Sequence, residues 1–329
     1  MARLFGLLAS PEMSRWRVRM VAALVLTVVA KLFAVYAPVF FGDAINAIAA
    51  HEPAAAEPGA VIGWMSGGAA AGFAFAFIAY AAARFLSVGA PQLRDAMFAP
   101  VSQDAQRLTS VRAFGHVQGL SIGFHQMKRT GALNRIIDRG ARAVDFLMRF
   151  LIFNIAPTLL ELVLAAGVLS LRYGWEFAVI ALTTVGVYMA MTWSVTDWRV
   201  KIRRDMNNAD NEANARAVDS LINFETVKAF AAERRETDAY DDVMQRYAKA
   251  AAKSQSSLAV LNGGQALVMN TGLLAMALVA GWKAWTGELQ PGDVAAVTLM
   301  LMSIYQPLNI LGWAYREIKQ SAVDMERLF

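Results

Sequence analysis

The sequence predicts an all-α membrane protein with six transmembrane helices and long helical extensions into the cytoplasm. Of its 329 residues, 57% are hydrophobic and only 17% are charged, whereas charged residues make up about a quarter of a typical soluble domain. Lys and Arg residues gather in a few segments between the apolar stretches. Six stretches are apolar over the roughly 20 residues that a spanning helix needs, namely 20–41, 61–88, 146–170, 174–195, 257–285 and 294–315.

Each of these stretches is continuous and rich in Ala, Leu, Val and Met, which favours helices over the short alternating segments of a membrane barrel. The stretch 20–41 is longer than the apolar core of a signal peptide, which is typically about 7–15 residues. We therefore interpret it as an uncleaved first span, although Ala47-Ile48-Ala49 resembles a cleavage site.

The distribution of basic residues predicts the orientation of the spans. Of the 31 Lys and Arg residues, 26 lie in the segments 1–19, 89–145, 196–256 and 316–329. The connections 42–60, 171–173 and 286–293 together contain one, Arg172. Because Lys and Arg are enriched on the cytoplasmic side of membranes, both termini and both long loops are expected in the cytoplasm.

The two long cytoplasmic loops, 89–145 and 196–256, contain 57 and 61 residues. The first has Pro91 and Pro100 near its start and is predicted to be helical from Val101 onward. The second contains no Gly or Pro and is rich in Ala, Glu, Lys and Arg, which favours a helix. The similar lengths predict two equivalent cytoplasmic structures, each built from helices that continue past the membrane.

Several kinds of chemistry are excluded by residues that the sequence lacks. It contains no Cys, so disulfides, thiolate metal sites and Cys nucleophiles are excluded. Its three His residues have no metal-binding spacing, so no metal site is expected. No phosphate-binding loop, nucleophile elbow or dinucleotide fingerprint occurs. We therefore expect no catalytic residue, no ATPase site and no cofactor in this chain, and the membrane-flanking charges give no reason to expect a nucleic-acid partner.

Ionisable and amide residues within the spans are candidate functional residues because they are costly in lipid. For Lys31 and Arg84, snorkelling or a structural ion pair is the alternative to substrate contact. For Arg149, Asn154 and Glu161, the alternative is hydrogen bonding between helices.

A second polar group lies at the cytoplasmic half of the later spans. Arg199 and Arg203 are four residues apart and share a helix face, as do Asn262 and Gln265, while Arg316 closes the sixth span. Guanidinium groups pair with carboxylates, and amides both donate and accept hydrogen bonds. These five residues can bind a small molecule with carboxylates and peptide groups, but spacing alone leaves a solvated interfacial face as the alternative.

Longer segments add a family resemblance. They comprise Ser121–Gly131, Arg135–Gly140, Phe153–Leu162, Asp219–Lys228 and, in the sixth span, Gln306-Pro307-Leu308, Leu311-Gly312 and Tyr315-Arg316. Together they resemble half-size type I ABC exporters of the mitochondrial and heavy-metal-tolerance class.

This resemblance implies a domain-swapped homodimer in which a cytoplasmic segment, 1–19, precedes a six-helix transmembrane domain, 20–316. Coupling loops at about 115–124 and 219–226 would dock on nucleotide-binding domains, the second on the partner subunit's. The implied coupling residues are His116, Leu120, Phe124, Asp219, Asn223 and Glu225. Residues 317–329 would begin the connection to a nucleotide-binding domain, which would bind ATP and Mg and is absent from this chain.

The resemblance also implies a substrate. Exporters of this class carry glutathione derivatives, including glutathione disulfide and metal or persulfide conjugates, and are linked to iron–sulfur maturation and heavy-metal detoxification. Their glutathione contacts correspond to Tyr188, Arg199, Arg203, Leu258, Asn262, Gln265, Ile310, Gly312, Trp313 and Arg316. The sequence departs from the family pattern at Gln118 and Ala229, in or beside the coupling loops, and at Gly263, Gly264 and Trp313 in the implied pocket.

The hypothesis from the sequence is thus the membrane-spanning, substrate-binding half of an ATP-driven exporter of glutathione derivatives. The alternatives are an exporter of lipid or another amphiphile with the same fold, and an ATP-independent transporter or structural membrane protein. Because no transit peptide precedes the first span, the lipid bilayer is expected to be the bacterial inner membrane, with the mitochondrial inner membrane as the alternative.

Overall fold

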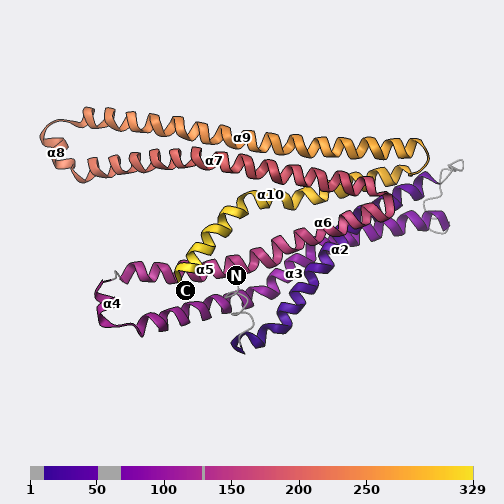
Figure 1. Ribbon diagram of the computed structural model, residues 1–329, viewed down its shortest axis with the longest axis horizontal. Coiled ribbons are helices and arrows are strands. Elements are labelled where there is room, and N and C mark those ends of the chain that lie inside the picture. Colours follow the sequence, from indigo (N-terminus) through magenta and orange to yellow (C-terminus); the bar gives the residue numbers. More distant parts are fainter. Residues whose placement is uncertain (1–10, 51–67, 128–129, 329) are drawn as a thin grey trace, which may run out of the picture. The chain divides into compact units, whose positions relative to one another are not determined.

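The computed structural model describes residues 11–50, 68–127 and 130–328. The side chains of residues 68–71, 125–127, 130, 132, 306, 309–316, 319, 320 and 327 are not described. All regular structure in these residues is helical (Figure 1). In chain order the elements are η1 (Pro11–Trp16), α2 (Arg17–Ala49), α3 (Gly68–Gln118), α4 (Ile122–Met127), α5 (Thr130–Phe150), η3 (Leu151–Ile155), α6 (Ala156–Val168), η4 (Leu169–Tyr173), α7 (Trp175–Ile222), α8 (Phe224–Ala229), α9 (Glu233–Trp285) and α10 (Pro291–Leu328).

Five helical segments of the described chain are long and apolar enough to cross a membrane: Pro11–Ala49, Gly72–Gln118, Leu133–Tyr173, Trp175–Ile222 and Glu233–Trp285. Each is longer than the roughly 20 residues that a bilayer requires. The sixth predicted span, 294–315, falls within α10, whose described apolar part, Pro291–Tyr305, is shorter. Five of the six predicted spans are therefore matched, and part of 61–88 lies outside the described residues.

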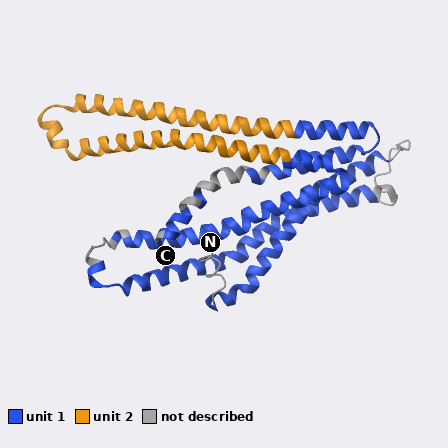
Figure 2. Cartoon of the chain, in the orientation of Figure 1, with its two compact units in different colours: residues 1–182, 273–329 blue, residues 183–272 orange. Residues whose placement is uncertain are grey.

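The chain forms two compact units (Figure 2). Unit 1 contains residues 1–182 and 273–329, and unit 2 contains residues 183–272. In unit 1, α2 packs against α3, α6 and α10, and α5 packs against α3 and α10. Residues far apart in the sequence therefore meet within this unit.

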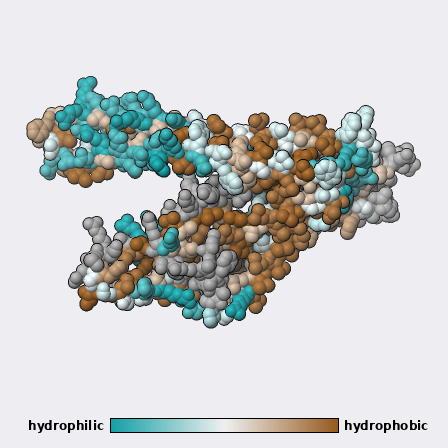
Figure 3. Space-filling model, in the orientation of Figure 1, coloured by the Kyte–Doolittle hydropathy of each residue, from teal (hydrophilic) through white to brown (hydrophobic). Residues whose placement is uncertain are grey.

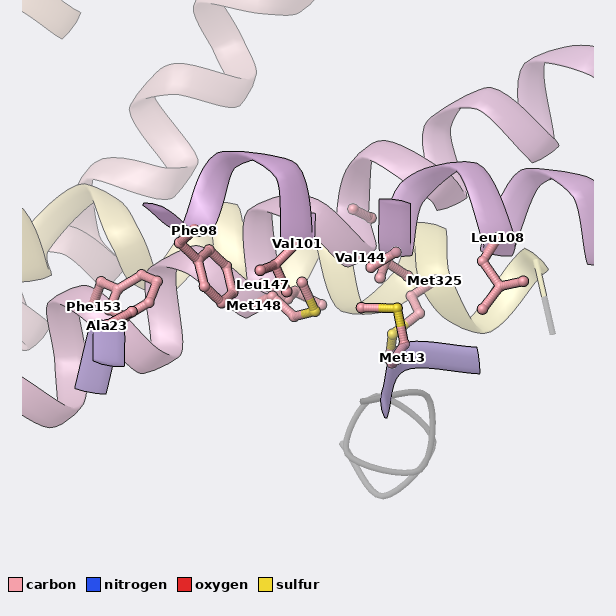
Figure 4. Close-up of a cluster of buried hydrophobic side chains, with 12 residues drawn as sticks. Met13, Ala23, Phe98, Val101, Leu108, Val144, Leu147, Met148, Phe153 and Met325 are labelled. Carbon is pink, nitrogen blue, oxygen red and sulfur yellow. The ribbon is translucent and has the colours of Figure 1, made fainter. Parts of the chain in front are cut away.

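The core of unit 1 joins η1 to helices from both ends of the chain (Figure 4). Met13 of η1 is fully buried with Val101 of α3, Leu147 of α5 and Met325 of α10. Hydrogen bonds to one carboxylate hold the same segment, because Arg15 and Trp16 donate to Asp104 over 2.6 and 2.8 Å. The η1 segment, Pro11–Trp16, is therefore part of the packed structure.

The structure corrects the predicted helix start at Val101. Helix α3 is continuous from Gly68 to Gln118 and contains both Pro91 and Pro100. A proline removes one helical hydrogen bond, but membrane helices tolerate this because neighbouring groups compensate. Phe98 and Val101 beside Pro100 are buried, and the Phe98 ring packs edge-on against Phe153 with centroids 4.6 Å apart. Tertiary packing here outweighs the local effect of the prolines.

The third predicted span contains two changes of helix type. Residues Thr130–Tyr173 run as α5, η3, α6 and η4 without a break, and η3 and η4 are π-helical turns. In η3 the N–H of Ala156 bonds to the carbonyl of Leu151, five residues earlier. Such π-helical turns often occur at functional sites. Gly174 ends the segment with φ of 129°, which favours glycine.

Unit 2 consists of α7 from residue 183 onward, α8, and α9 up to residue 272. The turn from α8 to α9 includes Ala231, whose φ is 46°. Hydrophilic side chains gather toward the α8 end of this unit and hydrophobic ones toward its other end (Figure 3). This gradient is typical of a helical hairpin that leaves the membrane and continues into water.

Candidate functional site

Helix α7 carries three of the predicted site residues on its unit 2 segment. Tyr188 is fully buried, whereas Arg199 and Arg203 are partly exposed. The two arginines lie one helical turn apart, as their spacing requires. Two guanidinium groups are therefore presented side by side just beyond the apolar part of α7.

Helix α9 lies antiparallel to α7 and is bonded to it through this polar region. The Arg199 Nε donates to the Ser257 Oγ over 3.1 Å, and the Ser257 Oγ donates to the Ser254 carbonyl over 2.6 Å. Further along, the Gln265 Nε2 donates to the Oγ1 of buried Thr192 over 3.0 Å. Arg199 and Gln265 are thus oriented by bonds between the two helices.

Gly264 allows the two helices to approach closely beside Gln265. A Cβ at this position would lie 2.9 Å from both the Cε and the Sδ of Met191 on α7. Such a contact is closer than packed atoms allow, although a flexible Met can move. No atom lies within 4 Å of the corresponding point at Gly263, so only one of the two neighbouring glycines is needed for packing.

The structure brings six of the ten predicted substrate residues together in unit 2: Tyr188, Arg199, Arg203, Leu258, Asn262 and Gln265. Asn262 is exposed and Leu258 is partly buried. The other four, Ile310, Gly312, Trp313 and Arg316, belong to α10 in unit 1, and their side chains lie outside the described part of the structure.

The first predicted coupling loop, 115–124, spans the end of α3, a turn and the start of α4. His116 lies in the last turn of α3, Leu120 in the turn and Phe124 in α4. The backbone N–H of Phe124 bonds to the Ser121 carbonyl over 3.0 Å, which closes the turn. The short helix itself is Ile122–Met127, a few residues later than the predicted segment.

The second predicted coupling loop, 219–226, spans the end of α7 and the start of α8. The Asn223 Nδ2 donates to the carbonyl of Asp219 over 2.9 Å and to its Oδ1 over 3.1 Å. Glu225 lies in the first turn of α8, where a carboxylate interacts favourably with the helix dipole. These contacts fix the corner between α7 and α8.

An apolar surface lies beside the corner between α7 and α8. A cavity of about 460 Å³ is lined by residues of α7, α8 and α9, among them Leu221, Phe224 and Tyr240. Leu221, Ile222, Phe224 and Phe230 are all more than half exposed. Exposed large apolar side chains in an otherwise hydrophilic region are typical of a protein interaction site.

The charged residues within the spans are mostly paired, as the structural alternative predicted. The Lys31 Nζ lies 2.5 Å from the Glu161 Oε2, and Arg149 donates to the Ser102 Oγ and to Asp145 Oδ1 over 2.9 and 3.0 Å. Arg84 and Asn154 instead line a cavity of about 310 Å³ in unit 1 together with Lys31 and Glu161. The sequence marked each of these residues separately but not the cavity that they share.

Within the part of the chain that the structure describes, no three His, Asp or Glu residues are grouped so that they could hold a metal ion. The polar groups of unit 2 are cationic and amide side chains, which suit anions rather than metals. The chemistry available at this site is therefore recognition of carboxylates and amides.

Comparison with known proteins relates this arrangement to a family. Residues 20–308 match the family described as the ABC transporter transmembrane region. The mitochondrial iron-sulfur clusters transporter ATM1 of Chaetomium globosum is 38% identical over 328 residues, which cover 97% of this chain and 53% of the relative. ATM1 of Saccharomyces cerevisiae is 37% identical, with 95% and 44% covered.

A solved structure shares the fold as well. A bacterial Atm1-family ABC exporter with ATP bound is 36% identical, with a TM-score of 0.67, covering 95% of this chain and 53% of the other. The human mitochondrial transporter ABCB7 is 42% identical over 238 residues, which cover 72% of this chain and 32% of the relative. The chain thus spans about half, or less, of the length of these proteins.

Proposed function

Because the chain belongs to the ABC transporter transmembrane family, as the membrane domain of a half-size type I exporter, we propose that it forms the substrate-binding half of an ATP-driven exporter of glutathione derivatives. The substrates in this proposal are glutathione disulfide and metal or persulfide conjugates. The relatives named above are called iron-sulfur clusters transporters, which agrees with a thiol-based cargo.

The observation that carries the proposal is the set of side chains between α7 and α9. Arg199 and Arg203 share a helix face, and Gln265 is oriented by its bond to Thr192, which lies about two helical turns before Arg199 on α7. A carboxylate of the tripeptide would bind a guanidinium, and the amide side chains would bond its peptide groups. Tyr188, Leu258, Ile310, Gly312 and Trp313 would form the walls, and Arg316 would supply a third cation.

The proposal includes the assembly that the motifs imply. Two copies would form a domain-swapped homodimer with six spans each, and nucleotide-binding domains would dock at 115–124 and 219–226. Support comes from the exposed apolar side chains of Leu221, Phe224 and Phe230 around α8. ATP and Mg would bind the nucleotide-binding domains and not this chain.

The charge distribution supports a proposed orientation for this multi-pass membrane protein. Both termini and both long loops would be cytoplasmic because they hold most of the Lys and Arg residues. We propose the bacterial inner membrane as its location, since the exporter of similar structure is bacterial, although ATM1 and ABCB7 are named as mitochondrial.

The test is the affinity of the purified chain for glutathione disulfide. Hydrogen bonds to charged groups contribute about 1.5–3 kcal/mol, so Arg199→Ala should raise the dissociation constant roughly ten- to a hundredfold. Calorimetry in lipid nanodiscs measures this change directly. Binding should also become less dependent on salt, because a charged contact has been removed.

Arg204→Ala is the matched control, since Arg204 is an exposed arginine on the same helix, next to Arg203. It removes the same charge and should leave the affinity unchanged. If wild type, Arg199→Ala and Arg204→Ala bind equally well, the polar residues form only a solvated face. A lipid or another amphiphile would then be the better substrate hypothesis.

A further inference from the structure

A cluster of arginines lies where the first span begins. Arg15 is in the last turn of η1, and Arg17 and Arg19 are in the first turn of α2. All three are exposed. Asp104 of α3 is bonded to Arg15 over 2.6 Å and to Arg107 over 2.9 Å. Because one carboxylate is shared by two arginines, the cluster carries a net positive charge.

Trp16 holds two of these arginines on one side of the helix. The guanidinium carbons of Arg15 and Arg19 lie 5.2 and 5.1 Å from the centroid of its ring. The indole N–H donates to Asp104 over 2.8 Å, so the ring is attached to α3. Arg17 is two residues from both arginines, a spacing that places it on the opposite side of the helix. Within the described residues Arg17 forms no ion pair, so its charge is available to a ligand.

Arg17 lies at the N-terminal end of an exposed apolar stripe on α2. The stripe follows helical spacing, with exposed fractions of 38–59%, and consists of Val21, Leu24, Val25, Val28 and Leu32. The opposite face of α2, which contains Ala23, Thr27 and Ala30, is buried. From position 17 to position 32 the helix rises about 22 Å, whereas one leaflet contributes about 15 Å of hydrocarbon. The stripe is therefore long enough to contact a lipid acyl chain along its whole length in that leaflet.

Charge favours a lipid over a second copy of the chain as the molecule that covers this surface. A symmetric contact between two copies of this face would bring two Arg17 side chains together, and like charges repel. The phosphate of an anionic lipid has the opposite charge, and its oxygens match the paired N–H groups of a guanidinium. The negative surface of the cytoplasmic leaflet attracts basic residues, and the distribution of Lys and Arg favours that side for this end of α2.

We propose that Arg17 binds the phosphate of an anionic phospholipid whose acyl chain lies along the stripe from Val21 to Leu32. Arg15 and Arg19 attract the headgroup from a distance, because Trp16 holds them on the other side of the helix. The bound headgroup stabilises the junction between η1 and α2. This lipid site goes beyond the proposed export function and requires only that α2 spans a bilayer.

The first experiment measures binding of phosphatidylglycerol and phosphatidylcholine to the full chain in neutral detergent by native mass spectrometry. The two lipids are chosen with the same acyl chains, but only phosphatidylglycerol has a net negative headgroup, so it should bind roughly five- to tenfold more tightly. Arg17→Gln should remove most of this preference and leave the binding of phosphatidylcholine unchanged. The helical content and melting temperature of the variant show whether it is folded.

Arg19→Gln is the matched control. It removes the same charge only two residues away, from an arginine that is stacked on Trp16. It should weaken phosphatidylglycerol binding by no more than about twofold, since only a screened attraction is lost. Both variants should bind glutathione disulfide as the wild type does, because the arginines of α7 are unchanged.

Hydrogen exchange locates the bound lipid on the chain. In phosphatidylcholine nanodiscs, the addition of phosphatidylglycerol should slow amide exchange in residues 11–25, and Arg17→Gln should abolish this slowing. Residues 233–240 of α9 are an internal control, because they include two other exposed arginines, Arg234 and Arg235. Their exchange should not depend on phosphatidylglycerol.

Three results would overturn the lipid site. Equal losses of affinity for Arg17→Gln and Arg19→Gln would show attraction by general positive charge. Equal binding of the two lipids by the wild-type chain would show an apolar surface that any lipid or a second copy of the chain can cover. Full competition by glycerol 3-phosphate would show a phosphate site that does not need the stripe.

Discussion

The two units differ in how far their ion pairs are buried, as one pair from each unit shows. In unit 1, Lys31 and Glu161 join α2 to α6 within apolar spans, with side chains 23% and 5% exposed. In unit 2, Lys228 and Glu233 join α8 to α9 with side chains 70% and 48% exposed. Water can replace either partner of the second pair but not of the first. The same chemistry therefore fixes helix packing in unit 1 and contributes little in unit 2.

The largest expected effect is the removal of one partner from the buried pair. Glu161→Ala leaves the Lys31 ammonium without its carboxylate, which should lower the free energy of unfolding by about 3–5 kcal/mol. Equilibrium unfolding in mixed micelles measures this change. The double variant Lys31→Met, Glu161→Leu should recover most of the loss, because no charge is then left unpaired.

A loss below about 1 kcal/mol for Glu161→Ala would contradict the comparison. It would mean that Lys31 reaches water or lipid head groups without help, as a snorkelling residue does. The two units would then hold their charges in the same way.

An intermediate loss of stability is expected at Gly292, where the backbones of α2 and α10 pack closely in unit 1. A Cβ on Gly292 would clash with the Gly42 carbonyl oxygen, and the Gly292 N–H donates to the Asn46 Oδ1 over 2.7 Å. Gly292→Ala must separate α2 from α10, so the free energy of unfolding should fall by about 1–3 kcal/mol.

Gly281→Ala serves as its control, because no atom lies within 4 Å of the added Cβ. This change should be neutral or stabilise the protein by about 0.4–1 kcal/mol, since alanine restricts the unfolded chain. Equal destabilisation by the two substitutions would show that the contact at Gly292 does not limit packing.

The smallest effect is expected at the exposed pair of unit 2. Lys228→Ala removes the 2.8 Å contact with Glu233, and such surface pairs contribute about 0.2–1 kcal/mol. The melting temperature should therefore change little, and what change there is should shrink further in high salt. A loss as large as that of Glu161→Ala would remove the distinction between the units.

Much of the helical architecture was predictable because it depends on composition along the chain. The apolar stretches predicted five of the spans, and the segment 196–256, without Gly or Pro, predicted the long helices of unit 2. The expected helix start at Val101 was wrong, since the prolines of α3 are accommodated by packing that involves Phe98 and Phe153. Helix boundaries predicted from local sequence fail where contacts between distant segments determine the structure.

The candidate sites show the same limit. Helical spacing placed Arg199 and Arg203 on one face, but the bond of Arg199 to Ser257 of α9 could not be predicted from spacing. Lys31 and Glu161 were each marked as costly in lipid, although the sequence gives no reason to pair residues 130 positions apart.

The burial of Met13 against Met325 also has a consequence for the order of events during synthesis. Residue 13 leaves the ribosome before its partner in α10, which is made after all the other helices of the described residues. The η1 segment can form its contacts with α3 earlier, but its core contact is complete only when translation nears residue 325. Until then, Met13 lacks the contact with Met325 that completes its burial.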